Sequence, residues 1–201
     1  MAELEQYRRK RNFKKTSEPE GGKPQSDKLL FVVQKHAASH LHYDFRLEVR
    51  GVLKSWAVPR GPSMDPDERR LAQPVEDHPY DYKDFEGIIP KGQYGGGTVI
   101  VWDEGWYEPA EKLPTKQDQE HWMLSNYYKN ALEIIMHGQK LKGKFILIKF
   151  KDDKYPGSWR LIKAPDEYAS KEDILLATGS TRNTWSLKIK PACCGWLPWV
   201  V

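Results

Sequence analysis

Two histidines and an aspartate in the stretch QKHAASHLHYDFRLEVRG have the residue types and spacing of a metal site. His42 and Asp44 are separated by one residue, and His36 precedes them. Imidazole nitrogens and carboxylate oxygens are ligands that divalent transition metals recruit. Two neutral histidines and one carboxylate leave positions open for water and a substrate oxygen, and this set suits Mn²⁺, Fe²⁺ or Zn²⁺ better than Ca²⁺. The stretch therefore predicts a catalytic metal site.

The element that positions these groups is predicted by a strict alternation of residue types. Ionisable residues occupy the even-numbered positions: His40, His42, Asp44, Arg46, Glu48 and Arg50. Apolar residues occupy the odd-numbered positions: Leu41, Tyr43, Phe45, Leu47 and Val49. A helix would scatter the apolar set around its circumference, whereas a strand places it on one face. We therefore expect a half-buried strand at 41–49. Its polar face either meets water or holds the metal, and histidines beside a carboxylate favour the metal.

The rest of the chain favours an antiparallel β organisation. Further strands are predicted at 29–36, 52–59, 95–105, 131–138, 144–150 and 158–164. Residues 72–97 are predicted to form a loop, and residues 118–129 a helix that leads into the hairpin ALEIIMHG-QKLKG-KFILIKF.

Composition divides the chain into three parts. Residues 1–28 are polar and rich in charge, glycine and proline, which predicts a flexible basic arm able to dock onto the domain. Order is expected to begin at Leu29, and residues 29–190 form a single domain. Residues 191–201, PACCGWLPWVV, form an apolar tail that is either a docking peptide or a locally packed end.

Charge and cysteine content bound the function classes. The net charge is +4 and the basic runs at 8–11, 14–15 and 69–70 are either solvated or contact phosphates, so a nucleic-acid partner is permitted. No apolar run has the length of a membrane span, and no secretory signal is evident, so we expect a cytoplasmic monomer. Cys193 and Cys194 are adjacent and cannot build a disulfide framework.

A second polar cluster, VEDHPYDYKDFEG at 75–87, contains His78 and Tyr82. Alone, this cluster is as well explained by ordinary loop residues. Arg46 on the metal-bearing face, Arg60 and the pair at 69–70 add guanidinium groups suited to an anion, and a phosphate beside a cation is the simplest substrate for such a site. The glycines of PKGQYGGG lack the Lys-Ser/Thr ending of a nucleotide-binding loop and are interpreted as turn residues.

Two long motifs carry a family resemblance. LHYDFRLEVRGVLKSWAVPRGPS and EDHPYDYKDFEGIIPKGQYGGGTVIVWDEG resemble the 3′-phosphoesterase domain of DNA ligase D, which occurs fused to a ligase or alone. The resemblance covers roughly residues 5 to 170. It implies a mainly β fold, a compact antiparallel β-barrel core with one or two short flanking helices, and Mn²⁺-dependent trimming of DNA 3′ ends during end joining. A terminal ribonucleoside is removed to leave a 3′-phosphate, which is then hydrolysed to a 3′-OH.

The resemblance also assigns residues. It places metal ligands at His36, His42 and Asp44, with Mn²⁺ as the ion and Co²⁺ or Zn²⁺ as alternatives. Its catalytic residues fall on Arg46, His78 and Tyr82. Its substrate-binding positions are Glu18, Arg46, Arg60, Arg70, Glu76, His78 and Tyr82. Arg60 stands where a lysine is usual, Asn12 in KRNFKKTSEP replaces an aspartate, and His40 replaces an arginine and is expected to be a neighbour of the metal rather than a ligand.

The chemistry expected of these residues leaves alternatives. Arg46 and His78 neutralise charge on phosphorus and Tyr82 orients an oxygen; His78 as general acid is the alternative. Two rival functions are a non-haem iron oxygenase, in which His78 completes a triad with His42 and Asp44, and a non-catalytic nucleic-acid-binding module. The KxDG motif of nucleotidyl transfer is missing, so the expected partners are DNA or DNA–RNA 3′ ends, with a ligase, a polymerase and an end-binding protein in trans.

Overall fold

The computed structural model describes residues 4–151 and 154–176. The strands are β1 (Leu29–Ala37), β2 (Leu41–Val49), β3 (Val52–Val58), β4 (Arg69–Pro79), β5 (Gly87–Ile89), β6 (Gly97–Pro109), β7 (Ala131–Gly138), β8 (Lys142–Lys149) and β9 (Trp159–Lys163). The helices are α1 (Glu5–Arg9), α2 (Lys116–Tyr128) and the short 3-10 turns η2 (Tyr80–Asp84) and η3 (Ile174–Leu176).

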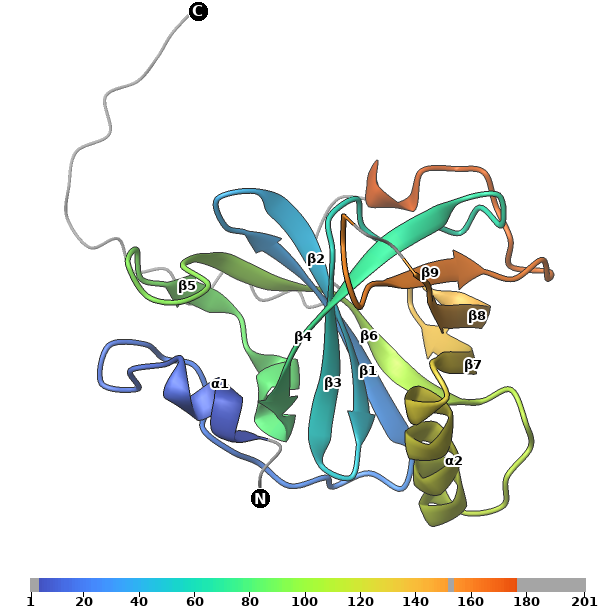
Figure 1. Cartoon of the computed structure of the whole chain (residues 1–201), viewed down its shortest axis with the longest axis horizontal. Coiled ribbons are helices and arrows are strands. Elements are labelled where there is room, and N and C mark those ends of the chain that lie inside the picture. The colour runs from blue at the N-terminus through green and yellow to red at the C-terminus, as the bar shows by residue number, and fades with distance from the viewer. Residues whose placement is uncertain (1–3, 152–153, 177–201) are drawn as a thin grey trace, which may run out of the picture.

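The sheet closes into an antiparallel barrel. Its strand order is β1-β2-β3-β4-β9-β8-β7-β6, and β1 also pairs with β6, which completes the ring. β5 adds to β6 outside the ring. Figure 1 shows α1 and β5 on one side of the barrel and α2 on the opposite side. The predicted fold class, a β-barrel with one or two short helices, is confirmed for the described part of the chain.

Large apolar side chains fill the barrel interior. The odd-numbered residues of β2 from Tyr43 to Val49 belong to this core, together with aromatic residues of other strands: Tyr43, Phe45, Leu47, Val49, Trp56, Trp102, Phe145 and Trp159. Burying one such side chain contributes roughly 2–3 kcal/mol to folding. The interior therefore holds the strands in register, and function must be sought outside this closely packed core.

The outer face of β2 is also covered, which corrects the prediction of a half-buried strand. Every residue from Tyr43 to Val49 is buried, including the even-numbered polar ones. A second apolar cluster lies over this face, and its members come from α1, β3, η2 and the residue after it, and the strands β5 and β6: Tyr7, Leu53, Tyr82, Phe85, Ile89 and Val99. Asp44 and Arg46 are thus buried on the outer face of the barrel wall, whereas His42 remains partly exposed.

Part of that layer is the segment before β1. The sequence predicted order from Leu29 onward, but the structure has α1 earlier in the chain and places residues 4–28 against the barrel. Tyr7 of α1 is fully buried, and its hydroxyl donates to the carbonyl of Pro19 at 2.6 Å. The division into arm, domain and tail stays a prediction, and residues 177–190 and 191–201 lie outside the described residues.

The loop predicted at 72–97 is wrong, because most of this region forms β4, η2 and β5. This region contains prolines at 74 and 79, which are unfavourable in a strand paired on both edges. However, β4 pairs with β9 only over Arg69–Ala72 and with β3 only beyond that point, so a proline lacking its N–H can lie where one edge of β4 is unpaired. Prolines are tolerated in a strand on these terms.

The predicted helix and hairpin are confirmed with small shifts of boundary. α2 begins after Thr115, whose Oγ1 accepts from the N–H of Asp118 at 3.1 Å in an N-cap. Met123 is the buried residue of α2, and β7 and β8 form the hairpin that follows. Among the described residues, no helix combines the length and the apolar character needed to cross a membrane.

Candidate active site

The predicted metal ligands converge at one end of the β1–β2 pair. His36 of β1 lies opposite His42 of β2 in the ladder, and Asp44 follows on the same face of β2. One ligand atom from each residue lies within 4.8 Å of the others. His36 Nδ1 is 3.4 Å from Asp44 Oδ2, and His42 Nε2 is 3.8 Å from Asp44 Oδ1. We call these three residues the metal group.

Hydrogen bonds to backbone carbonyls orient both imidazoles. His36 Nε2 lies 2.8 Å from the carbonyl oxygen of Gly95, and His42 Nδ1 lies 2.9 Å from that of His40. A carbonyl only accepts, so these nitrogens carry the protons and the opposite nitrogens, which face Asp44, present lone pairs. The donor set is therefore two neutral imidazole nitrogens and a carboxylate, which fits a divalent transition metal. His40 itself is exposed and contributes its backbone, as expected of a neighbour.

Asp44 is held as a carboxylate by the arginine beside it. Burial alone acts to raise its pKa, but the charge of the Arg46 guanidinium outweighs burial and lowers it. Arg46 Nη2 is 3.2 Å from Asp44 Oδ2. The same guanidinium donates through Nε to Gln34 Oε1 and through Nη1 to Ser55 Oγ, both at 2.8 Å. Arg46 is thus fixed in place by three strands, β1, β2 and β3.

His78, at the end of β4, lies between two guanidinium groups. Its Nδ1 is 2.9 Å from Arg46 Nη1 and 2.8 Å from the carbonyl oxygen of Glu76, and its Nε2 is 3.1 Å from Arg11 Nη2. A proton on Nδ1 satisfies the carbonyl and leaves Nε2 to accept from Arg11. Burial, followed by the charges of Arg46 and Arg11, lowers the pKa of His78 well below 6.5. His78 is therefore neutral near pH 7.

The lowered pKa of His78 predicts a pH dependence of folding. In the unfolded chain a histidine takes up a proton near pH 6.5, whereas buried His78 does not, so the unfolded state binds more protons below this pH. Stability falls as pH drops below 6.5, by up to about 1.4 kcal/mol per pH unit from this group. Urea unfolding between pH 5 and 7 measures the free energy of unfolding of the native protein and of His78→Gln. This free energy should depend less steeply on pH in the variant. His121→Gln, at an exposed histidine of α2, keeps the native slope; equal slopes for all three proteins would contradict the assignment.

Tyr82 of η2 packs against both His78 and Arg46. Its ring centroid is 4.6 Å from that of His78, and the Arg46 guanidinium lies 4.8 Å from the ring. Its hydroxyl donates to Glu18 Oε1 at 3.0 Å, away from the metal group. Burial raises the pKa of Tyr82 well above 10, so it remains a phenol.

Arg11 is the most important site residue that the sequence did not single out. It belongs to the run RRKR, which was expected to be solvated or to contact phosphates, yet its side chain is buried. Arg11 donates to Glu18 Oε1 at 2.8 Å and to Glu76 Oε1 at 2.9 Å. Its place in the family motif KRNFKKTSEP was a signal for it. Gln34 was also missed, although it shares a strand face with His36.

Glu18 and Glu76 lie in this network rather than in the metal group. Glu76 also accepts from Lys10 Nζ at 3.0 Å. Burial acts to raise the pKa of Glu76, but the hydrogen bonds from Arg11 and Lys10 lower it, so it is a buried anion. The substrate-binding role of Glu18 and Glu76 stays a prediction. The structure places Arg11 beside both glutamates and Lys10 beside Glu76.

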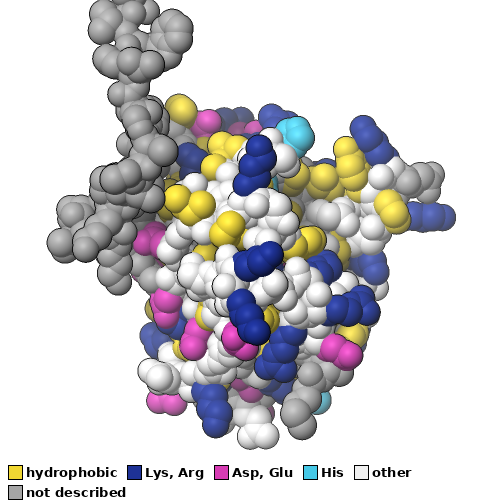
Figure 2. Space-filling model, turned by 90° about the vertical axis from the view of Figure 1, so that its left-hand side faces the viewer, with side chains coloured by type: hydrophobic (Ala, Val, Ile, Leu, Met, Phe, Trp, Pro, Cys, Tyr) yellow, Lys and Arg dark blue, Asp and Glu magenta, His cyan; other side chains and the backbone are white. Residues whose placement is uncertain are grey.

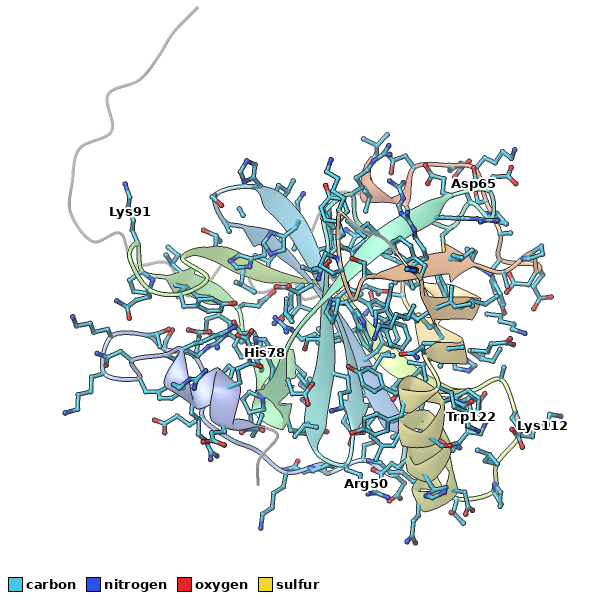
Figure 3. The ribbon with its side chains drawn as sticks, viewed as in Figure 1. Arg50, Asp65, His78, Lys91, Lys112 and Trp122 are labelled. Atoms are coloured by element: carbon cyan, nitrogen blue, oxygen red, sulfur yellow. The ribbon has the colours of Figure 1, made fainter. Side chains whose placement is uncertain are left out.

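Arg60 and Arg70 line a separate pocket of about 420 Å³. Arg70 Nη2 donates to Glu68, whereas its buried Nε has no hydrogen-bond partner among the described residues. Lys171 adds a third cation to this pocket. Figure 3 shows Asp65, another lining residue, well separated from His78. These two arginines are therefore not part of the cluster that contains Arg46.

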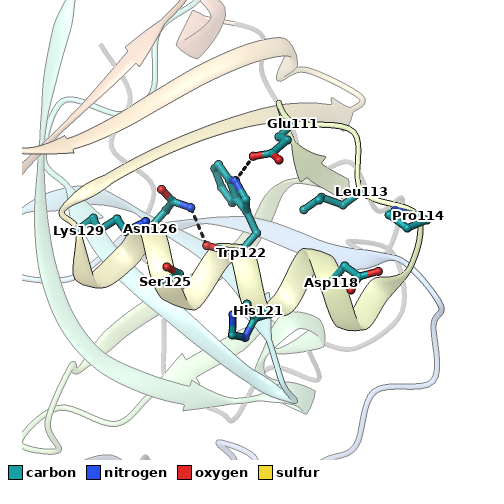
Figure 4. Close-up of a pocket in the computed structure, with 9 residues that line it drawn as sticks. All are labelled: Glu111, Leu113, Pro114, Asp118, His121, Trp122, Ser125, Asn126 and Lys129. Carbon is teal, nitrogen blue, oxygen red and sulfur yellow. Dashed lines mark hydrogen bonds between the residues drawn. The ribbon is translucent and has the colours of Figure 1, made fainter.

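A larger pocket, of about 550 Å³, lies between α2 and the segment that precedes it (Figure 4). Trp122 Nε1 donates to Glu111 Oε2 at 2.8 Å across it. None of the predicted site residues lines this pocket. This larger hollow and the metal group are thus different places on the molecule.

Comparison with known proteins agrees with the resemblance seen in the sequence. The family model described as the DNA ligase D 3′-phosphoesterase domain matches residues 34–149. The matched segment contains the whole metal group, Arg46, His78 and Tyr82, and it leaves out Arg11 and Glu18.

Several curated relatives are similar over most of the chain. The "Multifunctional non-homologous end joining protein LigD" of Pseudomonas aeruginosa is 47% identical over 173 residues, which is 85% of this chain and 19% of that protein. The corresponding DNA repair protein of Mycobacterium tuberculosis is 39% identical over 183 residues, 90% of this chain and 22% of the relative. That of Mycolicibacterium smegmatis is 43% identical over 154 residues, or 74% of this chain. The chain spans about a fifth of the length of these relatives.

Proposed function

The chain belongs to the DNA ligase D 3′-phosphoesterase domain family, and we propose that it trims DNA 3′ ends during non-homologous end joining. The proposed substrate is a primer-template whose primer ends in a ribonucleoside. Removal of that ribonucleoside leaves a 3′-phosphate, and hydrolysis of the phosphate leaves a 3′-OH. The names of the bacterial relatives support the setting of end joining, and with DNA as substrate the proposed location is the cytoplasm.

The observation that carries this proposal is the metal group with Arg46 at its edge. The donor set of His36, His42 and Asp44 would hold Mn²⁺, with Co²⁺ or Zn²⁺ as alternatives. A bound ion of this kind supplies Lewis acidity toward a phosphoryl oxygen and a lower pKa for water. The arrangement therefore offers both charge neutralisation and a place for a phosphate at one point of the surface.

Arg46 is the proposed phosphate-binding residue. Nη2 carries two N–H bonds, and among the described residues it meets only Asp44, so the second N–H can donate to a phosphoryl oxygen. As negative charge grows on that oxygen in the transition state, the hydrogen bond strengthens. The bonds to Gln34 and Ser55 keep the guanidinium from reorienting during the step.

His78 and Tyr82 support the position of Arg46 in this proposal. Neutral His78 keeps its Nε2 lone pair for Arg11, so it acts by holding the two guanidinium groups apart rather than as the acid that protonates the leaving oxygen. The ring of Tyr82 packs against the guanidinium of Arg46 and meets the ring of His78 edge-on. Arg60 and Arg70 are proposed to bind phosphates of the strand farther from the end.

The structure does not assemble the ligand set of the rival oxygenase. That function needs His78 beside His42 and Asp44, but His36 occupies the third position and both ring nitrogens of His78 face protein partners. A purely nucleic-acid-binding module would not need an oriented pair of imidazoles. Phosphoester hydrolysis is therefore the function that uses all the groups brought together here. Ligation, polymerisation and end binding are proposed to come from partner proteins or from other parts of a longer protein.

A matched pair of histidine variants tests the proposed function. We expect His42→Ala to reduce the release of the terminal ribonucleoside from a labelled primer-template in Mn²⁺ by at least about 100-fold. Loss of a residue that only orients a metal ligand costs up to about 100-fold, and loss of the ligand itself should cost at least as much. His40→Ala keeps the backbone carbonyl that holds His42 and should change the rate by less than about 3-fold. Equal losses in the two variants would contradict the metal assignment. Binding without product from the native protein would contradict catalysis.

A further inference from the structure

An exposed aromatic side chain stands next to the metal group. Tyr94 lies in the turn 90–96 between β5 and β6, and 48% of its surface is exposed. The ring is nevertheless fixed. Lys10 Nζ donates to its hydroxyl at 3.1 Å and lies 4.6 Å from the ring centroid, and the hydroxyl lies 3.4 Å from Glu76 Oε2. The Arg11 guanidinium lies 5.5 Å from the ring centroid, and the remaining exposed part of this fixed ring is suited to stacking.

The turn that carries Tyr94 is tied directly to a metal ligand. Gly95, the next residue, supplies the carbonyl oxygen that accepts from His36 Nε2. Gly95 has φ of +74°, a conformation that other residues rarely adopt, so the carbonyl and the neighbouring tyrosine are presented by a specific backbone shape. A phosphorus atom held near the metal group would therefore lie within a nucleoside's reach of Tyr94.

In the order of strands along the barrel wall, the turn that carries Tyr94 and the two arginines of the second pocket lie on opposite sides of the metal group. Along the barrel wall the strands follow the order β6, β1, β2, β3, β4. The turn with Tyr94 leads into β6, the metal group is on β1 and β2, Arg60 follows β3 and Arg70 is on β4. A strand of nucleic acid that crosses the wall can thus place phosphates over the arginines and its terminal nucleoside toward Tyr94.

Other exposed apolar side chains border the same end of the wall. Leu41 and Ile88 stand at the two ends of a row that crosses β2, β1, β6 and β5 next to the row of His36 and His42, and strand alternation points the side chains of this row to the other face of the sheet. The two ends of this row, Leu41 and Ile88, are 51% and 63% exposed. Figure 2 shows the face that carries α1 and β5, where hydrophobic side chains lie among lysines and arginines. This mixture fits bases and phosphates together.

We propose that Tyr94 is the stacking platform for the base of the terminal ribonucleoside, the group that leaves in the first reaction. This assignment rests on the proposed function and deepens it by naming the leaving-group subsite. It makes a specific distinction between the two reactions. The ribonucleoside substrate has a base beyond the reacting phosphorus, whereas the 3′-phosphate substrate has none. Loss of the tyrosine ring must therefore affect the first reaction more than the second.

The test compares Tyr94→Ala with the native protein on two ends of one primer-template, a 3′-ribonucleoside and a 3′-phosphate. Base–aromatic stacking predicts that kcat/KM for ribonucleoside removal falls by about 10-fold, and that this loss exceeds the loss on the 3′-phosphate by at least about 5-fold. A third end, with an abasic ribose, should give the native protein and the variant similar rates of removal. Tyr94→Phe keeps the ring and should retain most of the activity on the ribonucleoside.

Controls separate stacking from a structural role. Tyr128→Ala removes a tyrosine of α2 that is 73% exposed, and it should leave both reactions unchanged. Mn²⁺ affinity by calorimetry should be the same for Tyr94→Ala and the native protein, because the Gly95 carbonyl is retained. Three results would each overturn the inference: equal losses of Tyr94→Ala on both substrates, no loss on either, or a loss on the abasic end as large as that on the ribonucleoside. Failure of the native protein to process either end would instead refute the proposed function, and the leaving-group subsite with it.

Discussion

Replacing Asp44 with asparagine should abolish Mn²⁺ binding at the metal group and lower the rate of ribonucleoside removal by about 1,000-fold or more. The asparagine side chain would keep the shape of the aspartate but offer a neutral oxygen and an amide that cannot balance a divalent cation. Arg46, 3.2 Å away and buried, would also lose its anion. Leaving a buried charge without its partner costs about 3 kcal/mol of folding free energy. Calorimetric Mn²⁺ titration, single-turnover kinetics and urea unfolding measure the three effects.

Asp103 provides the matched control for this substitution. It is a buried acid of the same barrel, and its carboxylate accepts from the backbone N–H groups of Gln139, Lys140 and Leu141. Asp103→Asn should destabilise the turn after β7 and leave Mn²⁺ binding intact. If Asp44→Asn bound Mn²⁺ with native affinity, the carboxylate would not be a ligand. If Asp103→Asn lost the metal equally, the effect would be a general consequence of disturbing a buried acid.

The second large effect is expected for Arg46→Lys, which keeps the charge and removes the fork of N–H donors. A lysine ammonium cannot reach Gln34, Ser55 and a phosphoryl oxygen at once. We expect kcat to fall by about 100- to 1,000-fold, comparable to the loss of one preorganised donor to a transition-state oxyanion. The lost hydrogen bonds also leave buried acceptors unpaired, at about 1–3 kcal/mol of folding free energy.

The metal readout distinguishes Arg46→Lys from the first variant. Arg46 is not a ligand, so Mn²⁺ affinity should change by less than about 10-fold while kcat falls. Arg160→Lys on β9, where the guanidinium covers the ring of Phe150, is the matched control and should retain native kinetics. A drop in Mn²⁺ affinity as large as the drop in kcat would show that Arg46 acts only through Asp44, and the proposed contact with phosphate would be withdrawn.

The metal group was predictable from the sequence because all its members lie on two paired strands. Alternation places His42 and Asp44 on one face, and the short connection between β1 and β2 brings His36 opposite His42. Most strands were predictable for the same reason: their apolar residues recur with the period of a strand. These are local patterns, and the barrel leaves them intact.

What escaped the sequence depends on contacts between distant segments. Arg11 and Glu76 are 65 residues apart, and no local pattern says that a basic run near the start of the chain will be buried against two acids. The prolines of β4 are unfavourable in a strand paired on both edges. Only the structure shows that each part of β4 is paired along one edge, its first part with β9 and the rest with β3. The buried polar face of β2 follows from the same covering layer.

The separation between the barrel interior and the outer face of β2 has a practical consequence for engineering. Phe45 lies between Asp44 and Arg46 in the chain, yet Phe45 belongs to the interior core, whereas Arg46 lies on the other face of the strand against Tyr82 of the second cluster. The interior core can therefore be redesigned for higher thermal stability while the site residues are left unchanged, provided that the strand pairing is kept. Selection for heat tolerance and selection for turnover can act on alternate residues of one ribbon.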